Sequence, residues 1–77
     1  MKYIEQVQGS AQAALPFIIG KDTIYIHTNV HLTEDEKNYE YHEYQFSYPE
    51  FNTDFLQLLD EDVRKDAIAQ LKEKQII

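Results

Sequence analysis

Histidine is the residue type in this chain best suited to metal binding or proton transfer at neutral pH. His27 and His31 lie four residues apart in a predicted strand and are expected on the same face. Four strand residues span about 13 Å, so two such imidazoles cannot hold one ion. His42, with Glu40 or Glu43 beside it, would still leave the ligand set incomplete. We therefore expect no metal site and interpret the histidines as polar residues on the open side of a sheet.

Nucleophilic catalysis has little support in the residue types present. The chain has no cysteine, and neither Ser10 nor Ser47 lies in a predicted strand–turn–helix elbow. Gly9 and Gly20 are the only glycines, so there is no glycine-rich loop to bind phosphate. Carboxylates are plentiful, but an acid–base pair needs a pocket that shifts one pKa, which a domain of 77 residues rarely provides. We expect no enzyme activity, no cofactor and no small-molecule substrate.

The aromatic residues are more informative. Five of the six tyrosines, with Phe46, fall in two predicted strands, 23–32 and 39–48. Tyrosine is amphipathic and loses little entropy on burial, so a tyrosine-rich face suits protein–protein contact. The alternative is that these rings build the core, but six rings cannot all pack on one helix, so at least two are expected on the other face. The predicted interaction face consists of Tyr25, His27, His31, Tyr39, Tyr41 and Tyr44.

The charge distribution restricts the class of partner. The net charge is −7, and residues 33–62 hold ten acidic residues against one lysine, a net of −9. Phosphate binding requires clustered cations, so we expect neither nucleic acid nor an anionic membrane as partner. Most acidic excess is a solvated face that keeps a protein soluble. A basic protein partner is the alternative.

Two adjoining strands are predicted in the first half of the chain. Residues 23–32 alternate strictly between apolar and polar positions in β-branched and aromatic types, which is typical of a strand with one buried face. Residues 14–19 precede it, joined by a tight turn at Gly20–Lys21 where the glycine can take a positive φ. Pro16 cannot donate a ladder hydrogen bond, which places this strand at an edge. Antiparallel pairing sets two apolar residues of each strand side by side: Phe17 and Ile19 with Ile24 and Ile26.

A third strand, 39–48, has an unusual aromatic pattern. The parity of its aromatic residues changes between Tyr41 and Tyr44. A β-bulge near His42 or Glu43 would restore a common face. The alternative is a strand with tyrosines on both faces, one of them open for a partner. The bulged register predicts the pairs Leu32–Tyr39, Val30–Tyr41, Ile26–Phe46 and Ile24–Tyr48.

From Thr53 onward the apolar period becomes helical. We predict one helix over about 53–74 with Thr53 as N-cap, because the apolar stripe keeps its phase across Asp60. The alternative is two helices joined near Asp60, where three acidic residues resemble a helix start. The stripe consists of Phe55, Leu56, Leu59, Val63, Ala67, Ile68 and Leu71.

The N-terminal residues are harder to interpret. Residues 2–8 fit a strand, with Tyr3, Glu5 and Val7 on one face and Ile4 on the other. Residues 9–14 fit a loop or a short helical turn.

The sequence from Asp22 to Tyr48 resembles small proteins encoded among the tail genes of phages and prophages of Gram-positive bacteria. Residues 23–26 and 28–30 match a strand motif of that family, and Tyr41, Glu43, Gln45 and Phe46 match part of a second motif that Tyr39 leads. The match covers about a third of the chain and includes no catalytic signature. The resemblance implies a minor structural or accessory role in a virus particle, without a cofactor, and it transfers no functional residues.

Together these features predict one α+β domain over 1–77. Residues 14–48 form a small antiparallel meander of three strands, residues 50–74 a helical tail packed on it, and residues 1–13 a loop or a fourth strand. Hydrophobic residues make up 43% of the chain, close to the globular average, and no segment is apolar enough for a signal peptide or a membrane span. The predicted core is Phe17, Ile19, Ile24, Ile26, Val30, Phe46, Phe55, Leu59, Val63 and Leu71.

The leading functional hypothesis is a non-enzymatic phage or prophage structural or accessory protein. It would act through contacts with other virion proteins or with itself as a homo-oligomer, in the cytoplasm of the bacterial host or in the virion. The first alternative is a small acidic inhibitor that mimics nucleic acid or binds a basic host protein. The second is a metal-dependent enzyme that uses the histidines.

Overall fold

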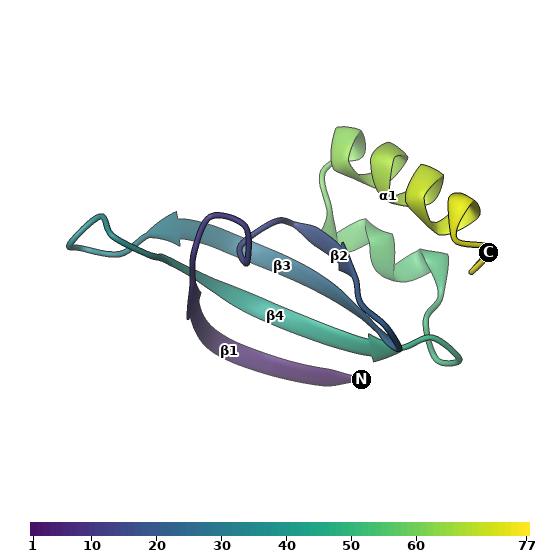
Figure 1. The fold of residues 1–77 in the computed structure, drawn as a ribbon, viewed down its shortest axis with the longest axis horizontal. Coiled ribbons are helices and arrows are strands. Elements are labelled where there is room, and N and C mark those ends of the chain that lie inside the picture. The colour runs from purple at the N-terminus through teal and green to yellow at the C-terminus, as the bar shows by residue number, and fades with distance from the viewer.

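A four-stranded antiparallel sheet and two helical segments form the fold in the computed structural model, which describes all 77 residues (Figure 1). The strand order is β1-β4-β3-β2. Both helical segments lie over one end of the sheet, and the β3–β4 hairpin extends from the other end. The α+β class is therefore confirmed. In chain order the elements are β1 Lys2–Gly9, β2 Phe17–Ile19, β3 Thr23–Leu32, β4 Tyr39–Ser47, the 3-10 helix η1 Thr53–Leu58 and the α-helix α1 Glu61–Glu73.

The predicted meander is present as β2, β3 and β4. β2 is an edge strand, as Pro16 immediately before it indicates, but it has only three residues. In the turn to β3, Gly20 does not take the expected positive φ. A Cβ at Gly20 would instead meet the Thr23 carbonyl oxygen at 3.0 Å, so the turn needs glycine for space. The two predicted apolar pairs are found: Phe17 opposite Ile26 and Ile19 opposite Ile24.

The predicted bulge in the third strand is wrong, because β4 pairs continuously through His42 and Glu43. The bulge lies in β3, where Asn29 and Val30 together oppose the single residue Tyr41. Asn29 has a φ of 53°, in the left-handed region that asparagine tolerates better than most residues. Of the predicted pairs, Leu32–Tyr39 is found, whereas Ile24 lies opposite Phe46 and Ile26 opposite Tyr44.

Because β4 is regular, its aromatic residues lie on both faces of the sheet, as the alternative interpretation of its pattern required. Residues paired across strands share a face, and successive residues alternate between faces. We name the two faces by what covers them. The helical face carries Ile24, Ile26, Glu40, His42, Tyr44 and Phe46. The crossover face carries Tyr25, His27, Tyr39, Tyr41, Glu43 and Gln45.

The N-terminal residues form a strand, β1, which pairs antiparallel with β4. β1 has a bulge of its own, where Glu5 and Gln6 oppose His42. The extra residue moves Val7 to the same face as Ile4, contrary to the predicted alternation. The two neighbours of β4 are therefore bulged at nearly the same level.

Residues 10–16 connect β1 at one edge of the sheet to β2 at the other, passing across one face (Figure 1). The segment begins with one helical turn, closed by the Ala14 amide donating to the Ser10 carbonyl at 3.0 Å. It lies close to the sheet, because a Cβ on Gly9 would meet the Ala13 Cβ at 2.8 Å and the Tyr41 hydroxyl at 2.9 Å. Gly9 therefore permits the close approach of this crossover.

The predicted single helix over 53–74 is wrong. η1 ends at Leu58; its C-cap, Leu59, has an extended backbone (φ −102°, ψ 154°), and Asp60 is extended as well. α1 then packs beside η1 (Figure 1). The N-cap of η1 is Asn52 rather than Thr53. The apolar stripe kept its phase across the break because both segments pack on the same core.

Arg64 joins the two helical segments. Its guanidinium donates from Nε to the Leu56 carbonyl at 3.3 Å and from a terminal nitrogen to the Leu59 carbonyl at 3.1 Å. The Leu56 carbonyl already accepts the Leu59 amide at 3.0 Å, so Arg64 adds a second donor there and supplies one to the Leu59 carbonyl just after η1. One side chain of α1 thus caps η1.

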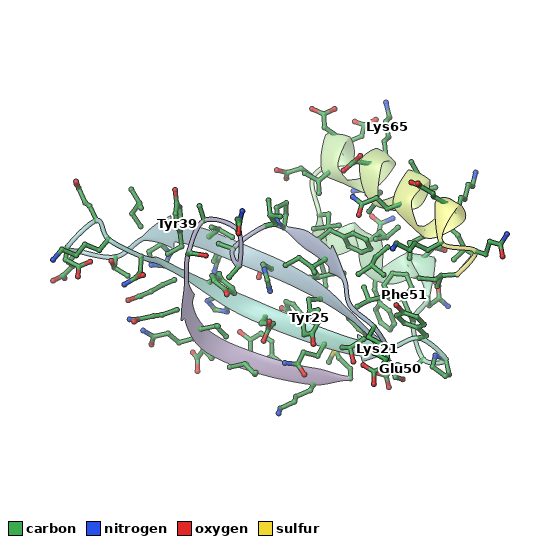
Figure 2. All side chains as sticks on the ribbon, viewed as in Figure 1. Lys21, Tyr25, Tyr39, Glu50, Phe51 and Lys65 are labelled. Atoms are coloured by element: carbon green, nitrogen blue, oxygen red, sulfur yellow. The ribbon has the colours of Figure 1, made fainter.

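The core lies between the helical face and the two helical segments. Phe46 stacks on Phe55 at a centroid distance of 4.4 Å and meets Phe51 edge-on at 5.7 Å; Figure 2 labels Phe51 there. Val30 was predicted in the core but is 40% exposed, because the bulge displaces it to the sheet edge. No helix is long and apolar enough to cross a membrane. The buried core cluster is Phe17, Ile24, Ile26, Phe46, Leu56, Leu59, Ala67 and Leu71, with Ile19, Phe55 and Val63 partly buried against it.

Candidate interaction surfaces

The six residues of the predicted interaction face do not share one face. The bulge in β3 inserts one residue, and such an insertion moves every following side chain to the opposite face. His27 and His31, predicted on one face, therefore lie on opposite faces. Figure 2 labels Tyr25 and Tyr39, which lie toward opposite ends of the sheet. The crossover face holds Tyr25, His27, Tyr39 and Tyr41, and the helical face holds His31 and Tyr44.

His27 is buried, which overturns its predicted role as a solvent-facing residue. Its side chain lies under the crossover, with Nδ1 2.7 Å from the Leu15 carbonyl oxygen and Nε2 3.0 Å from Oε1 of Glu43. Both partners are hydrogen-bond acceptors. Each ring nitrogen thus lies within hydrogen-bonding distance of an oxygen, one on the crossover and one on β4, so the imidazole bridges the two segments.

The remaining polar atoms around His27 are also paired. Gln45 donates to the second carboxylate oxygen of Glu43 at 3.0 Å. The Tyr41 ring lies 4.3 Å from the His27 ring, and burial, followed by the charge of Glu43, raises the pKa of the Tyr41 hydroxyl. No buried side-chain nitrogen or oxygen in the protein lacks a hydrogen-bond partner. This cluster attaches the crossover to the sheet.

The helical face has an open half that the helical segments do not cover. The helical segments lie at one end of the sheet, and the strands continue toward the β3–β4 hairpin (Figure 1). The side chains here are exposed or half-buried and mostly polar. We call Tyr3, Asn29, His31, Glu40 and His42 the open-face cluster.

His42 is the centre of one hydrogen-bond chain in this cluster. Nε2 of His42 lies 3.4 Å from Nδ2 of Asn29, and Nδ1 is hydrogen-bonded to the Tyr3 hydroxyl. The imidazole thus links the side chains of Tyr3 on β1 and Asn29 on β3 through its two ring nitrogens. The Tyr3 ring also packs on Tyr44 at a centroid distance of 4.8 Å.

His31 and Glu40 form a second chain. Nδ1 of His31 lies 2.8 Å from the Asn29 carbonyl oxygen, and Nε2 lies 3.5 Å from Oε2 of Glu40. Gln8 donates to the other oxygen of Glu40 at 3.1 Å. A hollow of about 260 Å³ adjoins His31, Glu40 and His42. The protein has no group of three or more histidine, aspartate and glutamate side chains arranged to hold a metal ion.

Sequence reasoning missed most of the open-face cluster, since only His31 was in the predicted interaction face. One signal was present. Asparagine is depleted in strands and tolerates the left-handed conformation, so Asn29 within a β-branched strand was the better candidate for the bulge. The cluster offers a partner aromatic ring faces and hydrogen-bonding groups held in position by one another.

Comparison with known proteins adds nothing to these observations, because no protein-family model, curated protein or solved structure matches the chain.

Proposed function

We propose that the protein works through contacts with other proteins, without catalysis of its own, as a structural or accessory component of a phage or prophage particle. The observation that carries this proposal is the open half of the helical face. Half of one face of the four-stranded sheet has no covering layer (Figure 1). The side chains of Tyr3, His42 and Asn29 there are hydrogen-bonded to one another.

The chemistry of this surface suits a protein partner. Tyr3 is 43% exposed, and His31 is exposed at the same surface. Aromatic rings that keep one polar end in water are enriched at protein interfaces because they bury a large area at low entropic cost. The hydrogen bonds among Tyr3, Asn29 and His42 reduce the freedom that these side chains would lose on binding.

The assignment to a phage particle rests on the resemblance of residues 22–48 described above. In that setting the protein would be made in the cytoplasm of the bacterial host and enter the virion with its partner. The partner is another virion protein or a second copy of this chain. An acidic nucleic-acid mimic is less well supported, since the acidic residues of 33–40 lie at the hairpin end and those of 60–62 near the helical end, not on one face (Figure 1).

Mass spectrometry of purified particles induced from the strain that carries the gene tests the proposal. We expect peptides of this chain in fixed proportion to known tail components. Finding the chain only in the cell lysate would contradict the structural role and favour the acidic inhibitor.

A paired variant then tests the surface. Tyr3→Ala combined with His42→Ala should reduce incorporation into particles by more than its loss of folded protein, measured by thermal unfolding, accounts for. Leu32→Ala is a matched control, because Leu32 is exposed but belongs to the crossover face. Equal incorporation of the double variant and the control would remove the open half from the interface.

A further inference from the structure

A groove runs beside the outer edge of the sheet, away from the open-face cluster. β2 pairs with β3 only over Phe17–Ile19, so the part of β3 from Thr28 to Leu32 has no strand on that side. The last backbone hydrogen bond there joins the His27 amide to the Pro16 carbonyl at 3.0 Å. Beyond it, β3 presents a free strand edge.

A hollow of about 470 Å³ lies beside the free edge at Thr28–Val30, and a second of about 400 Å³ lies between Leu15–Phe17 and α1. They share Pro16 and Val63, so they adjoin, and we call the two hollows together the groove. Three large apolar side chains border it while remaining exposed: Leu15 at 52%, Val30 at 40% and Leu58 at 41%. Exposed apolar side chains gathered along one groove are typical of an interaction site.

The charge around the groove has one sign. Asp60 lines the first hollow, and Asp62 and Asp66 line the second, whereas no lysine or arginine lines either. Arg64, which lies between Asp62 and Asp66 in the sequence of α1, donates to the carbonyls of Leu56 and Leu59. A second copy of this chain would bring the same three carboxylates and a net charge of −7 to the contact, so the charges oppose self-association here.

We infer that this groove binds an extended, basic segment of a partner protein, which adds as a strand beside Thr28–Leu32 with apolar side chains in the groove and cations against Asp60, Asp62 and Asp66. Strand addition supplies main-chain hydrogen bonds, and the groove supplies specificity for alternate side chains. The bulge at Asn29 and Val30 shortens the edge available for pairing, so side-chain contacts must contribute part of the affinity. The inference shares with the proposed function only the premise that the protein binds proteins.

The test uses a synthetic blocked nonapeptide that alternates lysine and valine, titrated into the full chain labelled with ¹⁵N. We expect chemical-shift changes concentrated at Thr28–Val30 and Leu58–Val63, with slower amide exchange along Thr28–Leu32. Shifts centred on the acidic hairpin 33–38, or none at millimolar peptide, would overturn the inference. Shifts of the groove residues on raising the protein concentration alone would also overturn it, in favour of a second copy.

Two matched pairs of variants test the contributions. Leu58→Lys should weaken peptide binding about tenfold, whereas Ile77→Lys, which is 49% exposed against 41% for Leu58 and lies outside the groove, should leave it unchanged. Asp62→Asn with Asp66→Asn should weaken binding more than Glu34→Gln with Glu36→Gln, which removes the same charge elsewhere. Equal losses within either pair would show non-specific attraction and reject the groove.

Failure here and failure of the proposed function are distinguishable. If the chain is found in particles but does not bind the peptide, the structural role is retained and the groove inference is rejected. A chain absent from particles that binds the peptide at the groove does the reverse.

Discussion

Two halves of the same sheet are built from the same strands and held in different ways. Near β2, the pairs Ile24–Phe46 and Ile26–Tyr44 lie under the helical segments, and pairing is regular. Toward the hairpin, both neighbours of β4 are bulged, and side-chain hydrogen bonds replace apolar packing. The helical layer covers one half of the sheet, and both neighbours of β4 pair with it regularly only in that half.

The largest expected difference between the halves is in packing. Phe46→Ala should lower the free energy of unfolding by about 3–5 kcal/mol, because the ring is fully buried and stacks on Phe55. Leu32→Ala, in the half of the sheet toward the hairpin, should change the free energy of unfolding by about 0.5 kcal/mol or less, since Leu32 is 48% exposed. Urea denaturation measures both, and similar losses would contradict the division into two halves.

The next largest loss of stability is expected on removing the hydrogen bonds that attach the crossover to the sheet. His27→Leu leaves the Leu15 carbonyl and the Glu43 carboxylate without their donor, so we expect a loss of about 1–3 kcal/mol. His27→Gln retains a donor and should lose less. A Leu variant as stable as the parent would mean that these bonds contribute no net stability.

The bulge in β3 should have a smaller effect. Asn29→Val places a β-branched residue in the left-handed region, at a cost of about 1–2 kcal/mol. Asn29→Gly adopts that conformation freely and loses only the weak contact to His42. If thermal unfolding finds the Val variant as stable as the Gly variant, the residue at 29 is not held in the left-handed region.

The smallest expected effect concerns pH at the hairpin. The hydrogen bond from the Thr33 hydroxyl, and then the one from the Lys37 amide, lowers the pKa of Asp35 in the folded protein. The stabilisation is therefore complete above the unfolded pKa and is lost as the pH falls through the lower folded pKa. Asp35→Asn should melt below the parent at neutral pH and approach it in acid. Thr33→Val should reduce this convergence, and a pH-independent difference would contradict the assignment.

The pairing of β2 with β3 was predictable because two independent features of the chain require the same register. Alternation in 23–32 and the turn after Ile19 determine the pairs of β2 with β3, and burial under the helical segments requires the same register. The tyrosines of β4 led to a wrong register for that strand because both of its faces are covered, one by the helical segments and one by the crossover. A period-two pattern identifies a buried face only when the other face is open.

The open-face cluster and the groove were not predictable from periodicity. The cluster depends on the one-residue bulge that moves His31 to the opposite face from His27. The groove depends on the break at Leu59 that turns α1 back along η1. The stripe from Phe55 to Leu71 has the same phase with or without that break. The acidic residues at 60–62 were the sequence signal for the break, and in the structure Arg64 holds α1 against the end of η1.

The crossover also has a consequence for the order of folding. β2, β3 and β4 are joined by short connections, so their pairing closes small loops. β1 meets β4 from the other end of the chain: Tyr3 bonds His42, 39 residues away. Pairing at such separation in sequence is slow because the chain entropy must be lost before the contacts form. We therefore expect the β2–β3–β4 meander to form first and β1 to dock afterwards, with residues 10–16 passing across a sheet that already exists.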